Sequence, residues 1–100
     1  MCGILGGNNE NWNYRAALEV IHHRGPDGKK IERIKDLFLG FVRLSIIDLN
    51  ENAMQPMLST DGRYAIVFNG EIYGYQKLRE ELTNKGYYFK TLSDTEVLLY

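Results

Sequence analysis

Apolar and polar positions divide the first third of the chain into a short strand, one helix and a loop. Residues 2–7, CGILGG, are an apolar run that ends in glycines, which predicts a strand. Four apolar residues then recur with the period of a helix face: Tyr14, Ala17, Leu18 and Ile21. Asn11 or a neighbouring residue could cap this helix. It should end near His22, because the proline and glycines of residues 24–28, RGPDG, cannot continue a helix.

Two later runs are apolar on both alternating faces, which is typical of strands buried on both sides. Residues 37–49, LFLGFVRLSIIDL, are interrupted at Arg43, which predicts two strands or one bent strand. Residues 63–73, RYAIVFNGEIY, have the same character. Asp61-Gly62 before this run and Asn69-Gly70 within it are signals of type I′ turns, so we expect an antiparallel meander. Such a sheet needs a further layer on each of its faces.

The last quarter of the chain has the signals of two helices. A helix is expected from about residue 75 to 85, with Gly86 ending it, and YYF at 87–89 predicts a strand. Ser93 and Glu96 of the sequence SDTE then form a capping box that begins a third helix. Because the chain ends shortly after that helix begins, we expect a longer protein to continue it.

The composition limits the class of protein. One hundred residues are enough for at most one small domain. With 44% hydrophobic residues, 25% charged residues and a formal net charge of −1, neither nucleic acid nor an anionic membrane is expected as a partner. The chain has no apolar run of the ~20 residues that span a bilayer, and no signal peptide. We therefore predict a cytoplasmic protein.

Few residues could bind a metal or form a disulfide. The single cysteine cannot make an internal disulfide, which agrees with a reducing compartment. His22 and His23 are adjacent, so on a helix their side chains would point about 100° apart. With no third histidine available, we expect no metal site.

The single cysteine, Cys2, directly follows the initiator methionine. If Met1 is removed, one residue carries both a thiol and a free α-amine. With pKa values of about 8.5 and about 7.7 to 8.0, the amine could take the thiol proton as the sulfur attacks a carbonyl carbon. The alternative is that Cys2 is only a small apolar residue of an edge strand, and its position alone favours that alternative.

Three further features could complete a site for acyl transfer. The Asn69 side-chain amide and the Gly70 N–H could stabilise an oxyanion, although Asn-Gly is also a common turn signal by itself. Arg43 could bind a substrate carboxylate, or it could be a strand-end arginine that reaches water. Asp94 could bind an ammonium group, or it could only stabilise the helix dipole. Together with Cys2, these groups could hydrolyse the side-chain amide of a free amino acid, with glutamine as the natural candidate.

Six motifs in a specific order point to a family. They are MCGI, HRGPDG, RLSIIDL, QPM, FNGEIY and SDTEVLL. In this order and spacing, essentially the whole chain resembles the N-terminal glutaminase domain of glutamine-hydrolysing asparagine synthetases. These enzymes are class II glutamine amidotransferases, which use an N-terminal nucleophile.

The resemblance implies an α+β fold, the four-layer αββα sandwich in which two antiparallel sheets face each other between helical layers. The family's glutaminase domain is nearly twice as long as this chain. We therefore expect residues 1–100 to be the N-terminal part of that domain and the sandwich to be incomplete. An isolated chain would expose apolar strand faces and could be unstable or form a homodimer.

The resemblance also implies roles for individual residues. Cys2 would be the nucleophile, and Asn69 and Gly70 would form the oxyanion hole. Glu71 and Asp94 would bind the amino end of glutamine. The complete set that would bind glutamine is Arg43, Leu44, Ser45, Ile46, Ile47, Asn69, Gly70, Glu71 and Asp94.

In the implied reaction, Cys2 attacks the γ-carboxamide of glutamine and releases ammonia, after which water hydrolyses the γ-glutamyl thioester. No cofactor is implied for this step. In the family, ammonia passes to a C-terminal synthetase domain that activates aspartate with ATP and magnesium, and nothing in this chain resembles that domain. Gly74 in IYGY stands where the family commonly has asparagine, a difference that we do not expect to abolish the site.

Two other interpretations stay open at this level. The same glutaminase could serve another acceptor carboxylate, which sequence beyond Tyr100 would decide. Alternatively, the segment could be a catalytically silent or self-associating fragment. The silent fragment predicts that Cys2→Ala has no consequence, whereas the enzyme predicts lost glutaminase activity with glutamine binding largely retained.

Overall fold

The structure is a computed structural model that describes residues 2–44 and 51–100. The predictions made for Ser45, Ile46 and Ile47 lie outside the described residues. The helices of the described ranges include none that is long and apolar enough to cross a membrane.

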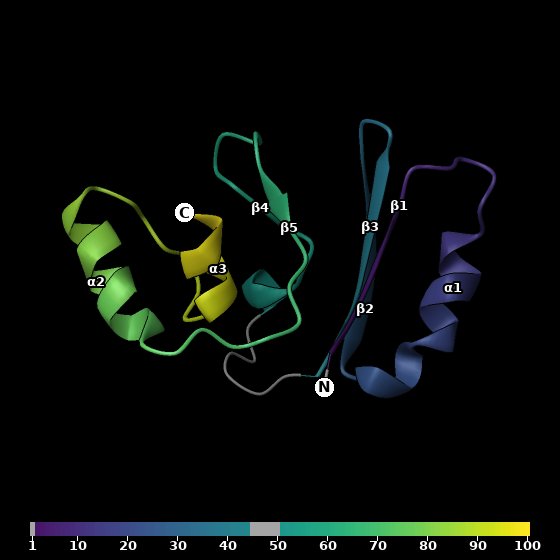
Figure 1. Ribbon diagram of the computed structural model, residues 1–100, viewed down its shortest axis with the longest axis horizontal. Helices are drawn as coiled ribbons and strands as arrows, with labels where there is room; N and C mark the ends of the chain where they lie inside the picture. Colours follow the sequence, from purple (N-terminus) through teal and green to yellow (C-terminus); the bar gives the residue numbers. More distant parts are fainter. Residues whose placement is uncertain (1, 45–50) are drawn as a thin grey trace.

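Three strands of the first half form one antiparallel sheet (Figure 1). They are β1 (Gly3–Gly7), β2 (Gly28–Ile34) and β3 (Leu37–Arg43), with β3 in the centre. On β3, Val42 pairs with Gly3 of β1, and Arg43 pairs with Gly28 of β2. If the pairing of β1 with β3 is continued by one residue, Cys2 lies opposite Arg43 at the end of the sheet. The strands predicted over residues 2–7 and in the first part of 37–49 are confirmed.

One helix covers one face of this sheet. α1 (Tyr14–Val20) begins at Asn13, whose side chain accepts a hydrogen bond from the Ala16 N–H at 3.0 Å, and the 3-10 helix η1 (His22–Arg24) follows it. Leu18 is 3% exposed and packs over Gly40, where an added Cβ would lie 3.2 Å from the Leu18 side chain. The close approach of helix and sheet therefore depends on a glycine in the central strand.

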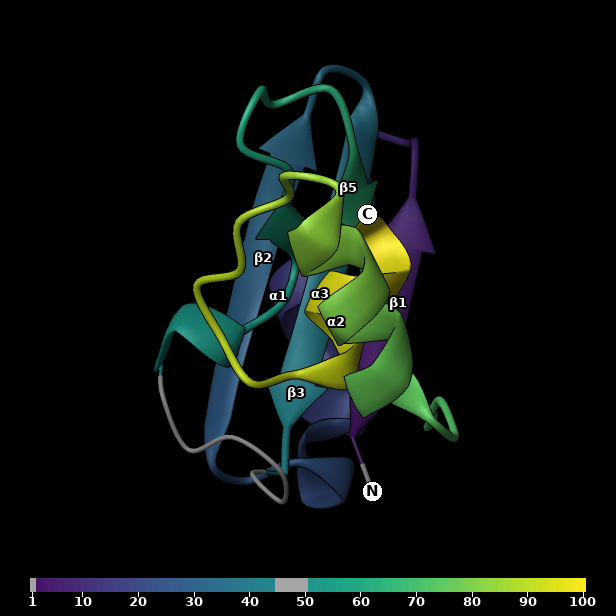
Figure 2. The ribbon, with the colours of Figure 1, turned by 90° about the vertical axis from the view of Figure 1, so that its left-hand side faces the viewer.

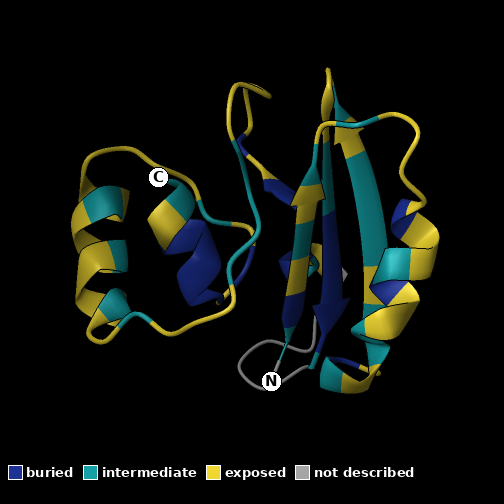
Figure 3. Cartoon of the chain, turned by 45° about the vertical axis from the view of Figure 1, so that its right-hand side comes forward, coloured by how far each residue is buried: buried dark blue, intermediate teal, exposed yellow. Residues whose placement is uncertain are grey.

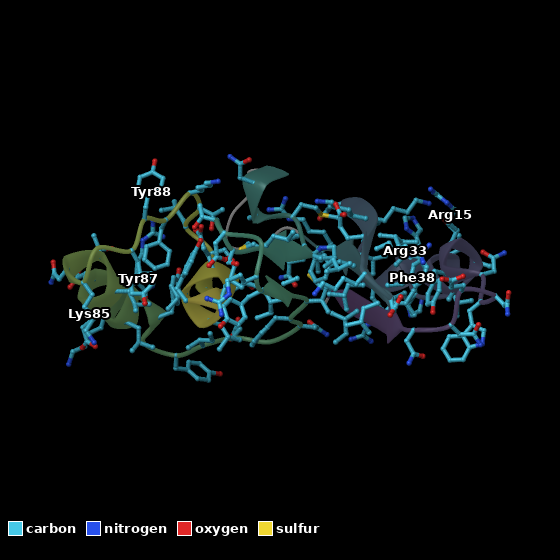
Figure 4. The ribbon with its side chains drawn as sticks, turned by 90° about the horizontal axis from the view of Figure 1, so that it is seen from above. Arg15, Arg33, Phe38, Lys85, Tyr87 and Tyr88 are labelled. Atoms are coloured by element: carbon cyan, nitrogen blue, oxygen red, sulfur yellow. The ribbon has the colours of Figure 1, made fainter. Side chains whose placement is uncertain are left out.

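The apolar pattern does not predict β2, whose sequence is GKKIERI. This strand pairs with β3 at one edge of the sheet, a place where charged side chains discourage pairing with other chains. Lys30 and Glu32 form an ion pair at 3.2 Å. Arg33 places its guanidinium 5.2 Å from the ring centroid of Phe38, its partner on β3 (Figure 4). Pairing with an apolar neighbour, rather than its own composition, makes this segment a strand.

The second half contains a short hairpin. After η2 (Glu51–Ala53), β4 (Met57–Leu58) pairs with β5 (Ala65–Ile66) in the antiparallel sense. The turn at Asp61-Gly62 is confirmed, but the type I′ prediction is wrong, because of these two residues only Gly62 has positive φ. Asn69-Gly70 is not a hairpin turn either. Neither residue has positive φ, and residues 69–74 contain no strand.

Two helices complete the chain (Figures 1 and 2). α2 (Tyr75–Asn84) is followed by Gly86, the predicted stop, which has φ +98° and donates its N–H to the Thr83 carbonyl at 3.0 Å. α3 (Asp94–Leu99) begins at Ser93, whose hydroxyl oxygen accepts the Thr95 N–H at 3.0 Å. The predicted N-cap is thus confirmed.

The predicted reciprocal bond of the capping box does not form. The Glu96 carboxylate instead accepts the backbone N–H groups of Lys90 and Thr91, at 3.0 Å and 2.8 Å. The predicted strand at residues 87–89 is also absent. The rings of Tyr87 and Phe89 pack on Tyr100, at centroid distances of 5.6 Å and 5.7 Å. Figure 4 shows Tyr87, Tyr88 and Lys85 at this end of the molecule.

Buried residues gather in two places, at β3 with α1 and at α3 with the β4–β5 hairpin (Figure 3). The buried apolar side chains are Tyr14, Leu18, Phe41, Val42, Ala53, Met57 and Val97. The radius of gyration is 14.0 Å, slightly above the ~13 Å expected for 100 residues. The fold is therefore mixed α and β with antiparallel sheets, as predicted, while the four-layer sandwich stays a prediction.

Candidate functional site

Cys2 lies at the beginning of β1, beside the residue that follows β3. Its Sγ accepts the Leu44 N–H at 3.2 Å and donates to the Leu44 carbonyl at 3.5 Å, and the residue is partly exposed. The thiol is therefore oriented by backbone atoms, whereas a purely structural cysteine of an edge strand would only need apolar neighbours.

The loop after α1 packs on the same end of the sheet. Arg24 donates its Nε–H to the Cys2 carbonyl at 3.0 Å. At Gly25, an added Cβ would lie 2.4 Å from the backbone carbon of Val42, so only glycine fits there. The Asp27 N–H donates to the Arg43 carbonyl at 2.9 Å. These contacts account for Arg24 and Gly25 of the motif HRGPDG, in which the sequence alone indicates no individual role for Arg24.

Arg43 is the last residue of β3 and is only 8% exposed. This burial disfavours the alternative in which the side chain simply reaches water from a strand end. A guanidinium held inside the protein is suited to binding a planar carboxylate through two hydrogen bonds. The structure thus brings Cys2, Arg43 and Leu44 together at one end of the sheet.

Asn69, Gly70 and Glu71 lie exposed in the segment between β5 and α2. The backbone is held by side chains on both sides of these three residues. Before them, the Gln55 amide bonds to the N–H and carbonyl of Phe68 at 2.5 Å and 3.2 Å. After them, Oδ2 of Asp94, a residue 5% exposed, accepts the Ile72 N–H at 3.1 Å.

The predicted site residues therefore form two groups of contacts. Cys2, Arg43 and Leu44 form one group at the end of the first sheet, and Asp94 anchors the segment 69–71 in the other. The hydrogen bonds described above run within each group. The segment that follows β5 descends toward the end of the sheet at which the chain begins (Figures 1 and 2).

Sequence reasoning finds Asp94 but misses Gln55 and Arg24. The signal for Arg24 is its place before Gly25, whose missing side chain lets this loop touch β3. Gln55 belongs to the motif QPM, but its bond to Phe68 is a tertiary contact with no local pattern. Within the described ranges, no three His, Cys, Asp or Glu side chains are grouped so that they could hold a metal ion.

Comparison with known proteins matches the sequence to a family. The family model described as "Glutamine amidotransferase domain" matches residues 1–100. Asparagine synthetase [glutamine-hydrolyzing] 1 of Bacillus subtilis is 47% identical over 99% of this chain, which covers 17% of that protein. A probable asparagine synthetase [glutamine-hydrolyzing] of Dictyostelium discoideum is 42% identical over 100% of this chain, which covers 19% of that protein.

Asparagine synthetase B [glutamine-hydrolyzing] of Escherichia coli is 41% identical over 85% of this chain, which covers 16% of that protein. The chain thus spans less than a fifth of the length of these curated relatives. Because the family model matches all one hundred residues, the chain belongs to the glutamine amidotransferase domain family.

Proposed function

We propose that this chain hydrolyses glutamine to glutamate and ammonia through a thioester on Cys2, and that the ammonia serves asparagine synthesis in a C-terminal synthetase domain. The observation that carries the proposal is the Cys2 sulfur, which is partly exposed and oriented by the Leu44 backbone at 3.2 Å beside the buried Arg43. The names of the relatives, which are glutamine-hydrolysing synthetases, support the same reaction.

The first chemical step forms a carbon–sulfur bond. After removal of Met1, the α-amine of Cys2 takes the thiol proton as Sγ attacks the amide carbon of glutamine. The Asn69 amide and the Gly70 N–H stabilise the resulting oxyanion. Collapse of this intermediate breaks the carbon–nitrogen bond, and the leaving nitrogen takes the proton from the amine and departs as ammonia.

The second step is hydrolysis of the thioester. Water attacks the same carbon, gives a proton to the α-amine, and the sulfur leaves to regenerate the thiol with release of glutamate. Arg43 holds the carboxylate of the amino acid throughout, and Glu71 and Asp94 hold its ammonium group. Since the Ile72 N–H bonds to Oδ2 of Asp94, Oδ1 is the oxygen that we assign to the ammonium.

This reaction needs no cofactor, and we assign ATP and magnesium to the synthetase domain. Residues 1–100 would be the N-terminal part of the amidotransferase domain, and the two antiparallel sheets would belong to its four-layer αββα sandwich. In that sandwich, a further layer packed against the first sheet would bring the segment 69–71 over Cys2.

The test is a covalent labelling experiment on the natural polypeptide that carries this chain. After treatment with methionine aminopeptidase, the protein is incubated with 6-diazo-5-oxo-norleucine, a glutamine analogue that alkylates a reactive thiol. One adduct on Cys2, together with glutaminase activity that Cys2→Ala removes, is the expected result. A processed Cys2 that stays unlabelled, with glutamine not hydrolysed, would contradict the proposal and favour the silent fragment.

A further inference from the structure

Gln55 is a buried polar residue whose side chain bonds to the chain just before Asn69. It is 5% exposed. Its Oε1 accepts the Phe68 N–H at 2.5 Å, while its Nε2 donates to the Phe68 carbonyl at 3.2 Å and to the Thr95 hydroxyl at 3.1 Å. Bonding both to the N–H and to the carbonyl of one residue is what a neighbouring strand does in an antiparallel sheet.

The Gln55 amide thus takes the place of a strand neighbour where the ladder has ended. β5 stops at Ile66, two residues before Phe68. A buried amide without partners would destabilise the protein by about 1–3 kcal/mol, so this side chain is tolerated only because both of its polar atoms are bonded. Its bonds therefore fix where the chain leaves the hairpin and enters residues 69–71.

The other end of this segment is fixed to the first turn of α3. Oδ2 of Asp94 accepts the Ile72 N–H at 3.1 Å, and the next residue, Thr95, is the second partner of Gln55. Both residues are 5% exposed and belong to the buried first turn of α3. The three residues 69–71 are therefore held at both ends by one group of buried side chains.

We propose that Gln55 is a positioning residue for the oxyanion donors, and this inference rests on the function proposed above. Gln55 does not touch glutamine. It acts through the Phe68 backbone, which sets the position and direction of the Asn69 amide and the Gly70 N–H. Loss of one oxyanion donor slows such enzymes by about 100- to 1,000-fold, and a displacement near 1 Å can cost about 100-fold.

The test compares two substitutions in the natural polypeptide that carries this chain. Gln55→Met keeps the length and bulk of the side chain but removes all three hydrogen bonds. Gln76→Met makes the same chemical change at an exposed position of α2 and is the matched control. For Gln55→Met, we expect glutaminase kcat to fall about 10- to 100-fold with the KM for glutamine nearly unchanged, because oxyanion stabilisation acts mainly in the transition state.

Two probes of Cys2 separate positioning from general damage. Iodoacetamide alkylates the thiol by displacing iodide and builds no oxyanion, so its rate should stay within about twofold of the wild-type rate. Glutamate γ-semialdehyde forms a tetrahedral adduct with an oxyanion, so its affinity should fall in parallel with kcat. The affinity for glutamate, the product, should not change.

An unchanged kcat in Gln55→Met would overturn the inference. So would an equal fall in kcat, in the rate of alkylation by iodoacetamide, and in the affinities for glutamate γ-semialdehyde and for glutamate. If Gln55→Met does not fold, Gln55→Glu takes its place, because it keeps an acceptor for the Phe68 N–H while it loses the donor to the Phe68 carbonyl. The same separation of kcat from alkylation is then required. Failure of the proposed function has a different signature, because the wild-type protein would then show no glutaminase activity that Cys2→Ala removes.

Discussion

Gly25 shows how one missing side chain allows two segments to meet at the candidate site. An added Cβ there would lie 2.4 Å from the carbonyl carbon of Val42 and 2.5 Å from the nitrogen of Arg43. Both neighbours are backbone atoms of the central strand, which cannot rotate away as a side chain would. The adjacent Arg24, which binds the Cys2 carbonyl, depends on this close approach.

We expect Gly25→Ala to destabilise the protein by about 1–3 kcal/mol or more, because the loop must lift away from β3. It should also reduce glutaminase activity, because Arg24 moves with the loop. Gly6→Ala is the control, since the nearest atom to its added Cβ is 3.7 Å away, an ordinary contact. Urea unfolding of both variants measures the difference, and equal stabilities would contradict the packing argument.

Asp61 provides a prediction about pH. The Arg63 N–H and then the Ser59 hydroxyl, both bonded to this carboxylate, lower the pKa of Asp61. A carboxyl group whose pKa is lowered on folding contributes stability above its unfolded pKa of about 3.9, and this contribution is lost as the pH falls through the folded value. Because the group is fully exposed, the contribution is screened by solvent.

We expect Asp61→Asn to lower the urea midpoint at neutral pH and to have less effect in acid, below the folded pKa, where wild-type Asp61 is itself protonated. Asp36→Asn, in the turn between β2 and β3, is the matched control. The measurement is the pair of midpoints for each variant at both pH values. A difference that is equal at neutral and acid pH would exclude the carboxylate as its cause.

Among the elements, α3 depends most on buried polar contacts. Glu96 is 4% exposed, and its Oε1 accepts the Thr91 N–H at 2.8 Å and the Thr91 hydroxyl at 2.9 Å. These bonds tie the segment before the helix to its first turn. The Glu96 carboxylate therefore fixes the first turn of α3, which carries Asp94 and Thr95.

Glu96→Gln should destabilise the protein by about 1–3 kcal/mol, because the NH₂ group that replaces one carboxylate oxygen cannot accept a hydrogen bond and would face a backbone N–H of Lys90 or Thr91. Glu80→Gln, at an exposed position of α2, should have almost no effect. Thermal or urea unfolding of the two variants tests this. If they proved equally stable, Glu96 would not hold the helix.

The helices and the two apolar strands β1 and β3 can be predicted from this sequence, but elements defined by a partner cannot. The periodicity around Leu18, Ser93 as N-cap and Gly86 as a stop are local signals, and all three are confirmed. β2 is charged and becomes a strand only by pairing with β3. Asn69-Gly70 has the sequence of a tight turn, but the Gln55 side chain holds the chain there in another path.

For the whole molecule, the same limit applies to the site. The roles of Cys2 and Arg43 could be predicted from their chemistry, although it is the pairing of β1 with β3 that brings the two residues together. The contacts between Asp94, Gln55 and the segment 69–71 could not, since each joins residues far apart in sequence. Two buried clusters result, one between α1 and the first sheet and one between α3 and the β4–β5 hairpin. The most extensive contacts between helices and strands lie inside one cluster or the other.

This division predicts that the two clusters respond separately to a core substitution. Leu18→Ala removes a side chain that is 3% exposed and should cost about 2–5 kcal/mol, most of it in the first cluster. Hydrogen exchange should then become faster in α1, β1 and β3, while the amides of α3 keep their protection. Val20→Ala, on the same helix but 73% exposed, is the control. If α3 lost as much protection as α1, the protein would unfold as one unit. The contacts between the two clusters would then be strong enough to couple their unfolding.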